Sequence, residues 1–305
     1  PLVSIIAVQY GHSEVTMEMI QSLTTISYPH IEIIIVDNGS PEGNPDIVKE
    51  KFPQIVYIKS GENLGFAGGN NLGFKIAKGK YILMLNNDTE VDPGFLQPLV
   101  DKMENNPELG IVSPKIRFFH NPDTIQYAGY EQINPVTQRG GSTGFGEKDL
   151  GQHDQDCEAA YGHGAAMMIP MEVIKKVGLM ADIFFLYYEE LDWAHRIRNA
   201  GYKVFYVHNS LVYHKESIST GGRISALKAY YMTRNRILYL RRNFSGVIFS
   251  LALLYQVLIA VPKNALGYLL KGDLKFIRAY FKGIYWHLVN LRSKQVHFSP
   301  KLKTK

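Results

Sequence analysis

Three acidic residues, Glu189, Glu190 and Asp192, lie within four positions, directly after an aromatic run at residues 184–188. They stand where a helix is predicted to begin, and the helix dipole stabilises carboxylates at that end. Crowding three acids beside Phe and Tyr side chains would nevertheless make full ionisation costly, which favours one of them as a general base. The pattern predicts a catalytic carboxylate without choosing among the three.

A second polar group, Asn86-Asn87-Asp88, follows the short apolar run of residues 81–85. An uninterrupted apolar run of this length predicts a strand buried on both faces. Polar side chains at the carboxyl end of such a strand lie where open α/β sheets bind ligands. An aspartate with oxygen-bearing neighbours suits a hard divalent cation and the phosphates that such a cation accompanies. A turn stabilised by Asn and Asp explains the same residues equally well.

Two further residues end predicted strands. Asp37 could accept hydrogen bonds from a base or a sugar hydroxyl, or it could close an Asx-turn. His214 ends a short β-like segment, and a single histidine is more often structural than a metal ligand. We expect His214 to bind metal only if the fold places it beside Asp88.

The glycine-rich stretch at residues 62–71 leads into a predicted helix. Its glycines permit close backbone approach, and N–H groups at a helix start favour anions; a tight connection between strand and helix is the alternative. The stretch follows the third predicted strand. A dinucleotide-binding Rossmann domain would carry its glycines after the first strand, where this chain has Gln9 and Tyr10.

Strands and helices alternate through the first hundred residues. Apolar runs at 3–10, 31–36, 55–58 and 81–85 are separated by helical patterns, which predicts an α/β fold with a mostly parallel sheet and helices on both faces. Residues 110–151 have no clear period, and we expect irregular strands and loops there. Short β-like segments at 204–208 and 211–214 follow.

The charge is unevenly distributed along the chain. From Arg223 to the end there are 16 Lys and Arg against one acid, Asp273, although the whole chain carries only +5. A helix at 226–242, an uncharged apolar run at 244–261 and a mixed basic and aromatic stretch at 268–291 predict a C-terminal helical, basic extension. Its composition favours an anionic membrane surface over nucleic acid; helices packed on the preceding body are the alternative for 244–261.

Compartment is predicted from two observations. Residues 2–8 lack the charged region and cleavage site of a signal peptide, and the single Cys157 fits a reducing compartment. We therefore expect a cytoplasmic protein held peripherally on the cytoplasmic face of the inner membrane.

Taken in order, these motifs resemble family 2 glycosyltransferases of the GT-A fold, especially bacterial rhamnosyltransferase-like members. The matching pieces span residues 1–240: 3–10, 36–40, 62–71, 85–90, 188–192 with Arg196, and 212–214. The resemblance implies a catalytic domain at 1–225, with a donor half at about 1–110 and an acceptor half at about 111–225. The helical, membrane-associating region would then be 226–305.

The resemblance also implies an inverting transfer of a sugar from a UDP- or dTDP-sugar to the hydroxyl of a glycan or lipid-linked glycan acceptor. Glu190 falls at the family's catalytic base, flanked by Glu189 and Asp192, and Asp88 and His214 fall at metal ligands for Mg²⁺ or Mn²⁺. The implied donor-binding residues are Gln9, Tyr10, Asp37, Asn63, Gly65, Gly69, Asn70, Asn86, Asn87 and Asp88.

Two positions depart from the family pattern. Asn86 replaces the first aspartate of the strict metal motif, and Glu190 stands where aspartate is usual. The first departure leaves room for a non-catalytic nucleotide-sugar binder. A nucleotidyltransferase is a third possibility, disfavoured because no glycine-rich, basic loop follows the first strand.

Overall fold

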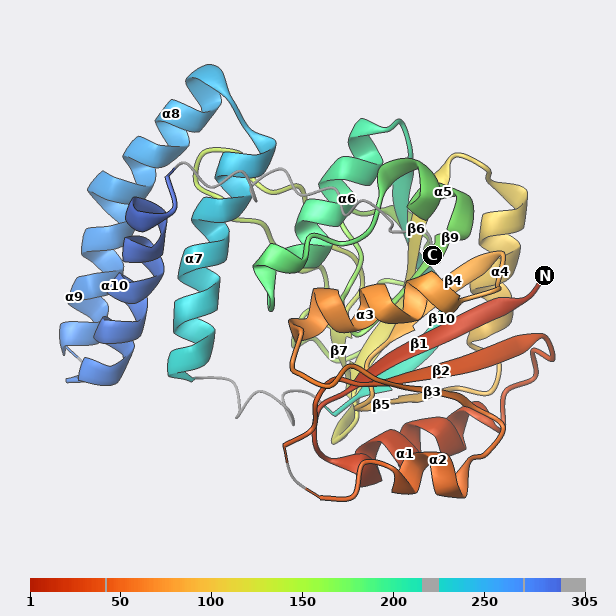
Figure 1. The fold of residues 1–305 in the computed structure, drawn as a ribbon. Helices are drawn as coiled ribbons and strands as arrows, with labels where there is room; N and C mark the ends of the chain where they lie inside the picture. Colours follow the sequence, from red (N-terminus) through yellow and green to blue (C-terminus); the bar gives the residue numbers. More distant parts are fainter. Residues whose placement is uncertain (42, 216–224, 271, 292–305) are drawn as a thin grey trace.

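A computed structural model describes residues 1–41, 43–215, 225–270 and 272–291 (Figure 1). The strands within these residues are β1 (Val3–Gln9), β2 (Ile31–Asp37), β3 (Val56–Lys59), β4 (Tyr81–Leu85), β5 (Thr89–Val91), β6 (Leu109–Phe118), β7 (Asn121–Tyr127), β8 (Cys157–Glu158), β9 (Ala166–Pro170) and β10 (Lys203–His214). The helices are α1 (Ser13–Leu23), α2 (Ile47–Lys51), α3 (Gly65–Ile76), α4 (Leu96–Asn105), α5 (Met171–Val177), the 3₁₀ turn η1 (Asp182–Phe184), α6 (Glu189–Asn199), α7 (Ala226–Asn243), α8 (Gly246–Tyr255), the π-helical turn η2 (Gln256–Ala260), α9 (Val261–Leu270) and α10 (Leu274–Val289).

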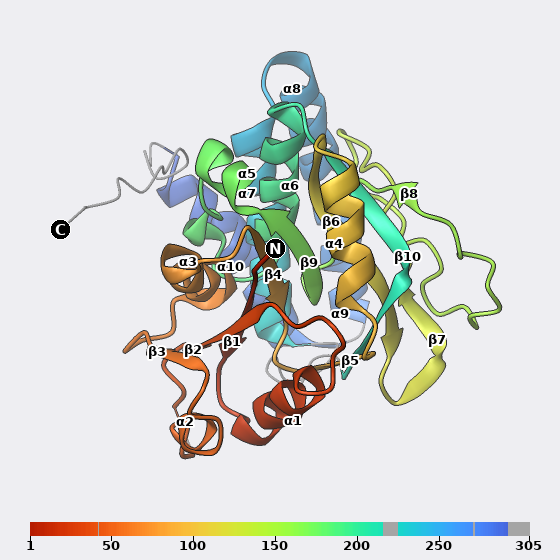
Figure 2. The ribbon, with the colours of Figure 1, turned by 90° about the vertical axis from the view of Figure 1, so that its right-hand side faces the viewer.

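One twisted sheet runs through the body in the order β3-β2-β1-β4-β9-β6-β10-β5. Its first four strands are parallel, as expected, and their register places Gln9 opposite Asp37 at the carboxyl edge. The second half is mixed: β9 runs antiparallel to β4 and β6, because it enters the sheet from the carboxyl edge, whereas β6 and β10 are parallel. Figure 2 shows β7 and β8 on the β10 side of the sheet, away from β3.

Helices cover both faces of the sheet. Apolar residues of α1, α2 and α4 form one core with alternate residues of β1, such as Ile5 and Ala7. Those of α3, α5 and α6 form the opposite core with Ile6, which lies between these two. This alternation follows from the strand geometry, in which successive side chains point to opposite faces. All five residues of β4 are buried, which explains its unbroken apolar run.

The prediction for residues 110–151 was wrong in one respect, because β6 is a regular strand of ten residues at the centre of the second half. Pro114 and Lys115 obscured its pattern. The segments expected at 204–208 and 211–214 are also one strand, β10, whose register shifts between Val207 and Leu211. The shift lies where Val207 faces Pro114, which cannot donate a ladder hydrogen bond.

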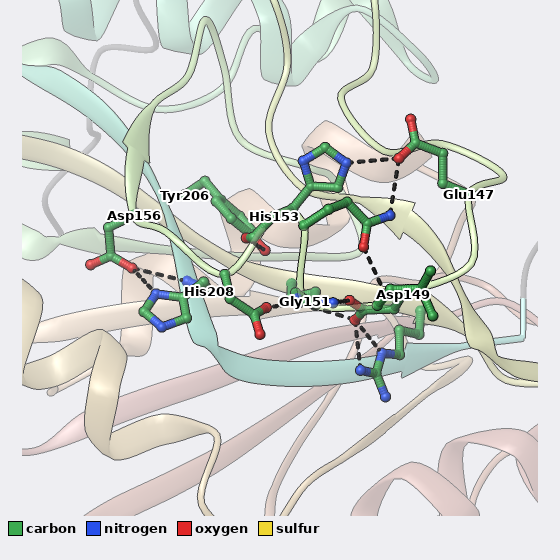
Figure 3. A network of polar contacts seen from close by, with 12 residues as sticks. Glu147, Asp149, Gly151, His153, Asp156, Tyr206 and His208 are labelled. Atoms are coloured by element: carbon green, nitrogen blue, oxygen red, sulfur yellow. Dashed lines mark hydrogen bonds and ion pairs between the residues drawn. The ribbon is translucent and has the colours of Figure 1, made fainter.

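A buried ion network fastens the long loop at residues 144–158 onto β6 and β10 (Figure 3). The Asp149 carboxylate, 2% exposed, accepts hydrogen bonds from Lys115 Nζ at 3.0 Å and Arg117 Nε at 2.8 Å. Further along the loop, Asp156 Oδ1 lies 2.7 Å from His208 Nδ1. A buried charge is costly unless it is paired. Moving the loop away would leave these charges without partners, so the network keeps the loop on the sheet.

The expected C-terminal helices form a separate layer beside the body (Figure 1). In α7, Leu238 and Tyr239 pack on Phe184 of the body, and α10 packs along α7. Continuous helix at residues 246–270 is long and apolar enough to cross a membrane, and only 17% of its most apolar window is buried. The last expected stretch, 292–305, lies outside the described residues.

Candidate active site

Pairing between β5 and the end of β10 brings Asp88 and His214 together. The register places His214 opposite Thr89, the residue after Asp88. His214 Nε2 lies 3.1 Å from Asp88 Oδ1, and both side chains are 8% exposed. His214 therefore lies beside Asp88, as a metal role for His214 requires.

Gln126 of β7 was missed by sequence reasoning. Its Oε1 lies 2.9 Å from His214 Nδ1, and the side chain is buried. With Nδ1–H donating to Gln126, Nε2 of His214 faces the Asp88 carboxylate. A cation between Nε2 and this carboxylate would be held by both. No local signal marks Gln126, because its position depends on the pairing of β6 with β7.

The loop His163-Gly164-Ala165 connects this pair to the acids of α6. On one side, Ala165 O accepts a hydrogen bond of 2.9 Å from Asn86 N, and the His163 and His214 rings have centroids 6.1 Å apart. On the other side, a Cβ on Gly164 would lie 2.2 Å from Glu190 Oε1. Only glycine therefore permits Glu190 to lie against this loop. Residues 86–88, 163–165, 190 and 214 form one continuous site.

His163 is a neutral member of this site. Burial, followed by the neighbouring His214, lowers the pKa of His163 to about 3. Its Nδ1 accepts a hydrogen bond of 3.1 Å from Ala165 N–H. His163 therefore adds no positive charge near Asp88.

Glu189 and Glu190 have different surroundings. Burial and then the charge of Glu190 raise the pKa of Glu189 well above its ordinary value, and its Oε2 is without a hydrogen-bond partner in the described structure. Burial also raises the pKa of Glu190, whose side chain remains partly exposed. Two close carboxyls do not both ionise readily. The buried Glu189 is the better site for a retained proton, and the accessible Glu190 is the better base.

Asp192 is a poor candidate for the base, contrary to its inclusion among the expected catalytic acids. The side chain is fully buried, with Arg242 Nε 2.8 Å from Oδ1 and Arg196 Nε 3.0 Å from Oδ2. Burial alone would raise the pKa of Asp192, but the hydrogen bond from Arg242 and the charge of Arg196 lower it. Both oxygens are engaged, so Asp192 joins α6 to α7.

A strained turn precedes the acids. Phe185, Tyr187 and Tyr188 have φ of 66°, 68° and 75°, a conformation that costs of order 1–3 kcal/mol for each such residue. Asn235 of α7 holds the turn, since its Nδ2 donates to the carbonyls of Phe184, Leu186 and Tyr187 at 2.9, 2.7 and 2.8 Å. The helical layer thus fixes the backbone that presents Glu190.

We expect Asn235→Ala to destabilise the protein by about 3 kcal/mol, because it leaves buried carbonyls without a donor. Thermal or urea unfolding measures the loss. Asn199→Ala, an exposed change on α6, is the matched control and should have little effect. Equal stability of the two variants would show that the hydrogen bonds of Asn235 do not stabilise the turn.

The expected donor residues of the first two strands meet at the carboxyl edge. Gln9 is fully buried and Tyr10 partly exposed, while Asp37 Oδ1 accepts hydrogen bonds from Ser40 N at 3.2 Å and Ser40 Oγ at 2.5 Å. The Asx-turn therefore accounts for Oδ1 of Asp37 but not for its second oxygen. Asn38, which the sequence did not single out, donates to Asn63 Oδ1 at 3.2 Å and so links this edge to the glycine-rich stretch.

The glycines of that stretch make close packing possible. Gly65 has φ of 72° and a Cβ there would lie 2.2 Å from Phe185 O, while one on Gly69 would lie 2.8 Å from Val8 Cγ1. Asn70 Nδ2 donates to Phe66 O at 2.9 Å within α3. These contacts favour the tight-connection explanation. They also place Asn63, which is exposed, at the edge beside Asp37.

Asn86 and Asn87 point different ways. Asn87 is buried and donates to Thr16 Oγ1 of α1 at 3.0 Å, so it supports the turn. Asn86 is partly exposed at the site. Among the described residues no cluster of three or more His, Cys, Asp or Glu could enclose an ion. Asp88 and His214 alone suit an ion that keeps waters and phosphate oxygens as its other ligands.

Comparison with known proteins identifies the family. The family model "Glycosyl transferase family 2" matches residues 4–178. N-acetylglucosaminyl-diphospho-decaprenol L-rhamnosyltransferase of Mycobacterium tuberculosis is 24% identical over 242 residues, which cover 71% of this chain and 77% of that protein.

Solved structures have the same fold. GalNAc-T7 with UDP, GalNAc and Mn²⁺ superposes with a TM-score of 0.63 at 15% identity, covering 79% of this chain and 48% of that one. The mannosyltransferase PcManGT of Pyrobaculum calidifontis, with GDP-Man and Mn²⁺, gives 0.57 at 15% identity, covering 96% and 88%. The predicted GT-A fold is confirmed, and this chain belongs to glycosyl transferase family 2.

Proposed function

We propose that this glycosyltransferase transfers a sugar from a nucleotide-diphosphate donor to an acceptor hydroxyl by single displacement, with inversion at the anomeric carbon. The observation that carries the proposal is the continuous site in which Asp88, His214 and Glu190 meet around the 163–165 loop. An ion ligand and a base on opposite sides of one loop suit a reaction that must stabilise a leaving diphosphate and deprotonate an attacking hydroxyl.

The donor would lie along the carboxyl edge of β1, β2 and β4. Asp37, with one oxygen outside the turn to Ser40, would accept hydrogen bonds from the nucleoside, beside Tyr10 and Asn63. Asn86 would reach the phosphates. Asp88 and His214 would hold Mg²⁺ or Mn²⁺, which supplies charge neutralisation for the departing nucleoside diphosphate.

Glu190 would take the proton of the acceptor hydroxyl. Its raised pKa strengthens it as a base, and Glu189, keeping its own proton, would leave Glu190 as the ionised member of the pair. The ring of Tyr130 stacks on Tyr161 at 4.1 Å and on His163 at 5.8 Å between centroids. His163 precedes Gly164, against which Glu190 lies, so these rings would guide a sugar toward Glu190.

A screen of nucleotide sugars by thermal shift, with and without Mn²⁺, tests this function. The true donor, a UDP- or dTDP-sugar, should raise the melting temperature only with the metal, because a ligand that prefers the folded state stabilises it. Release of nucleoside diphosphate on addition of a glycan acceptor would then confirm transfer. Release of inorganic diphosphate from a nucleoside triphosphate would instead indicate a nucleotidyltransferase.

We further propose that the acceptor is lipid-linked and that the helical layer rests on the cytoplasmic face of an anionic membrane. Large apolar side chains of α8, η2 and α9 are exposed, among them Val247 at 74%, Leu258 at 68% and Leu270 at 80%. An exposed apolar patch of this kind suits a membrane interface. The M. tuberculosis relative is named for a lipid-linked acceptor, which agrees with this placement.

Replacing Leu254 and Leu258 together by Glu should lower binding to phosphatidylglycerol vesicles at least tenfold, since burying each leucine is worth about 2 kcal/mol. Vesicle co-sedimentation measures this. Leu150→Glu, which alters a still more exposed leucine of the body, is the control and should bind like the native protein. Unchanged binding of the double variant would place the membrane contact elsewhere.

A further inference from the structure

A polar cavity of about 240 Å³ lies inside the helical layer. Its walls come from α7, η2, α9 and α10 and from the loop at residues 131–140. Two arginines line it, Arg236 from α7 and Arg139 from the loop, together with amides and hydroxyls, and among the described residues of its wall none is acidic. The chemistry of the wall is that of an anion site.

Gln256 gives this cavity an unpaired donor. The side chain is 4% exposed, it lines the cavity, and its Nε2 lacks a hydrogen-bond partner in the described structure. A buried amide without a partner costs of order 1–3 kcal/mol, so a ligand that accepts from it gains correspondingly. Gln256 begins the π-helical turn η2, and such turns are frequent at functional sites.

Residues of the cavity wall connect it to the active site on one side and to the apolar surface on the other. Arg236 Nε donates to Tyr188 OH at 3.0 Å, and Tyr188 directly precedes Glu189 and Glu190. The loop that supplies Arg139 begins after Tyr130, whose ring stacks on His163 at 5.8 Å between centroids. His163 precedes Gly164, against which Glu190 lies. On the other side, Val257, Leu258 and Ile259 follow Gln256 and are 55%, 68% and 52% exposed, so the same turn has a polar inside and an apolar outside.

Arg236 has no ion pair with a carboxylate in the described part of the chain. In contrast, Arg196 of α6 and Arg242 of α7 both pair with Asp192. A half-buried guanidinium without a protein anion is the expected partner of a bound one. Because the cavity lies between a base and a lipid-compatible surface, the anion it fits is one that joins a sugar to a lipid.

We propose that this cavity binds the phosphate or diphosphate group of a lipid-linked acceptor. The lipid chain runs along the exposed side chains of η2 and α8, Arg236, Arg139 and Gln256 hold the phosphate, and the attached sugar extends past Tyr188 to Glu190. This inference rests on the proposed function, since it concerns that reaction's acceptor.

Binding of farnesyl diphosphate to the full-length protein in detergent, with EDTA present and no donor, tests the proposal. EDTA removes metal-dependent diphosphate binding at Asp88. We expect Arg139→Ala and Gln256→Leu each to weaken binding about tenfold, the loss typical for a hydrogen bond to a charged group. Arg278→Ala removes an exposed arginine of α10 outside the cavity and should change nothing. Melting temperatures show whether each variant is folded.

Farnesol and inorganic diphosphate separate the two parts of the ligand. Farnesol should bind weakly and equally to all variants, and inorganic diphosphate should bind more weakly than farnesyl diphosphate but with the same dependence on Arg139. Unchanged farnesyl diphosphate affinity in both cavity variants, or farnesol binding as tight as the diphosphate, would overturn the proposal. Inorganic diphosphate binding as tightly as the lipid would reassign the cavity to a free anion. The donor screen decides the transferase function independently, because this assay contains neither donor nor metal.

Discussion

Glu190→Gln should lower the rate of sugar transfer by roughly 10²- to 10⁴-fold, the range for losing a general base. Gln has the shape of the protonated acid, so the packing against Gly164 is kept and the metal-dependent affinity for the donor should stay near the native value. Initial rates with the donor found by the thermal-shift screen, alongside donor titration, measure both. Turnover retained in this variant would refute the base assignment.

Glu189→Gln is the matched control for that variant. Glu189 is the acid that retains its proton in the proposed mechanism, so an amide in its place should preserve most of the activity. The reverse result, with Glu189→Gln inactive and Glu190→Gln active, would exchange the two roles.

The same assignment predicts the acidic side of the pH profile. A base works when deprotonated, and burial raises the pKa of Glu190. Activity should therefore fall as the pH decreases through a value above that of an ordinary glutamate. The residual activity of Glu190→Gln should lack this dependence.

Asp88→Ala should remove the metal-dependent part of donor binding, with a loss in affinity of at least about 100-fold, since substitutions of even the residues behind a metal ligand cost 10- to 100-fold. The reason is that Asp88, beside His214, is one of the two protein ligands that we propose for the ion. Titration of the donor at fixed Mn²⁺, and of Mn²⁺ in the absence of the donor, measures the effect.

Gln126→Leu tests the orientation of His214 in the same assays. Loss of the hydrogen bond to Nδ1 should weaken metal binding by roughly 10- to 100-fold while Asp88 remains in place. Asp123→Ala, which removes an exposed carboxylate outside the site, is the charge control for Asp88→Ala. If Asp88→Ala kept the metal dependence of the native protein, the ion would have to bind elsewhere.

Much of the first half of the sheet could be predicted because its signals are local. The unbroken apolar run at residues 81–85 predicted a strand buried on both faces, and β4 is such a strand. The alternation of strands and helices predicted parallel pairing, which brings Gln9 opposite Asp37. The second half could be predicted less well. Pro114 and Lys115 lie within the buried strand β6, where neighbouring side chains rather than residue type decide the structure.

The sequence by itself determined the fold class, the order of the motifs, the presence of a polar group after β4 and the basic, apolar extension. Only the tertiary structure decided which polar residues act together. In the structure, Asp192 pairs with two arginines, whereas Glu190 stays accessible. Gln126 contacts His214, and Arg236 and Gln256 line one cavity. The reason is physical: periodicity depends on near neighbours, whereas ionisation and coordination depend on groups that strand register brings together from distant parts of the chain.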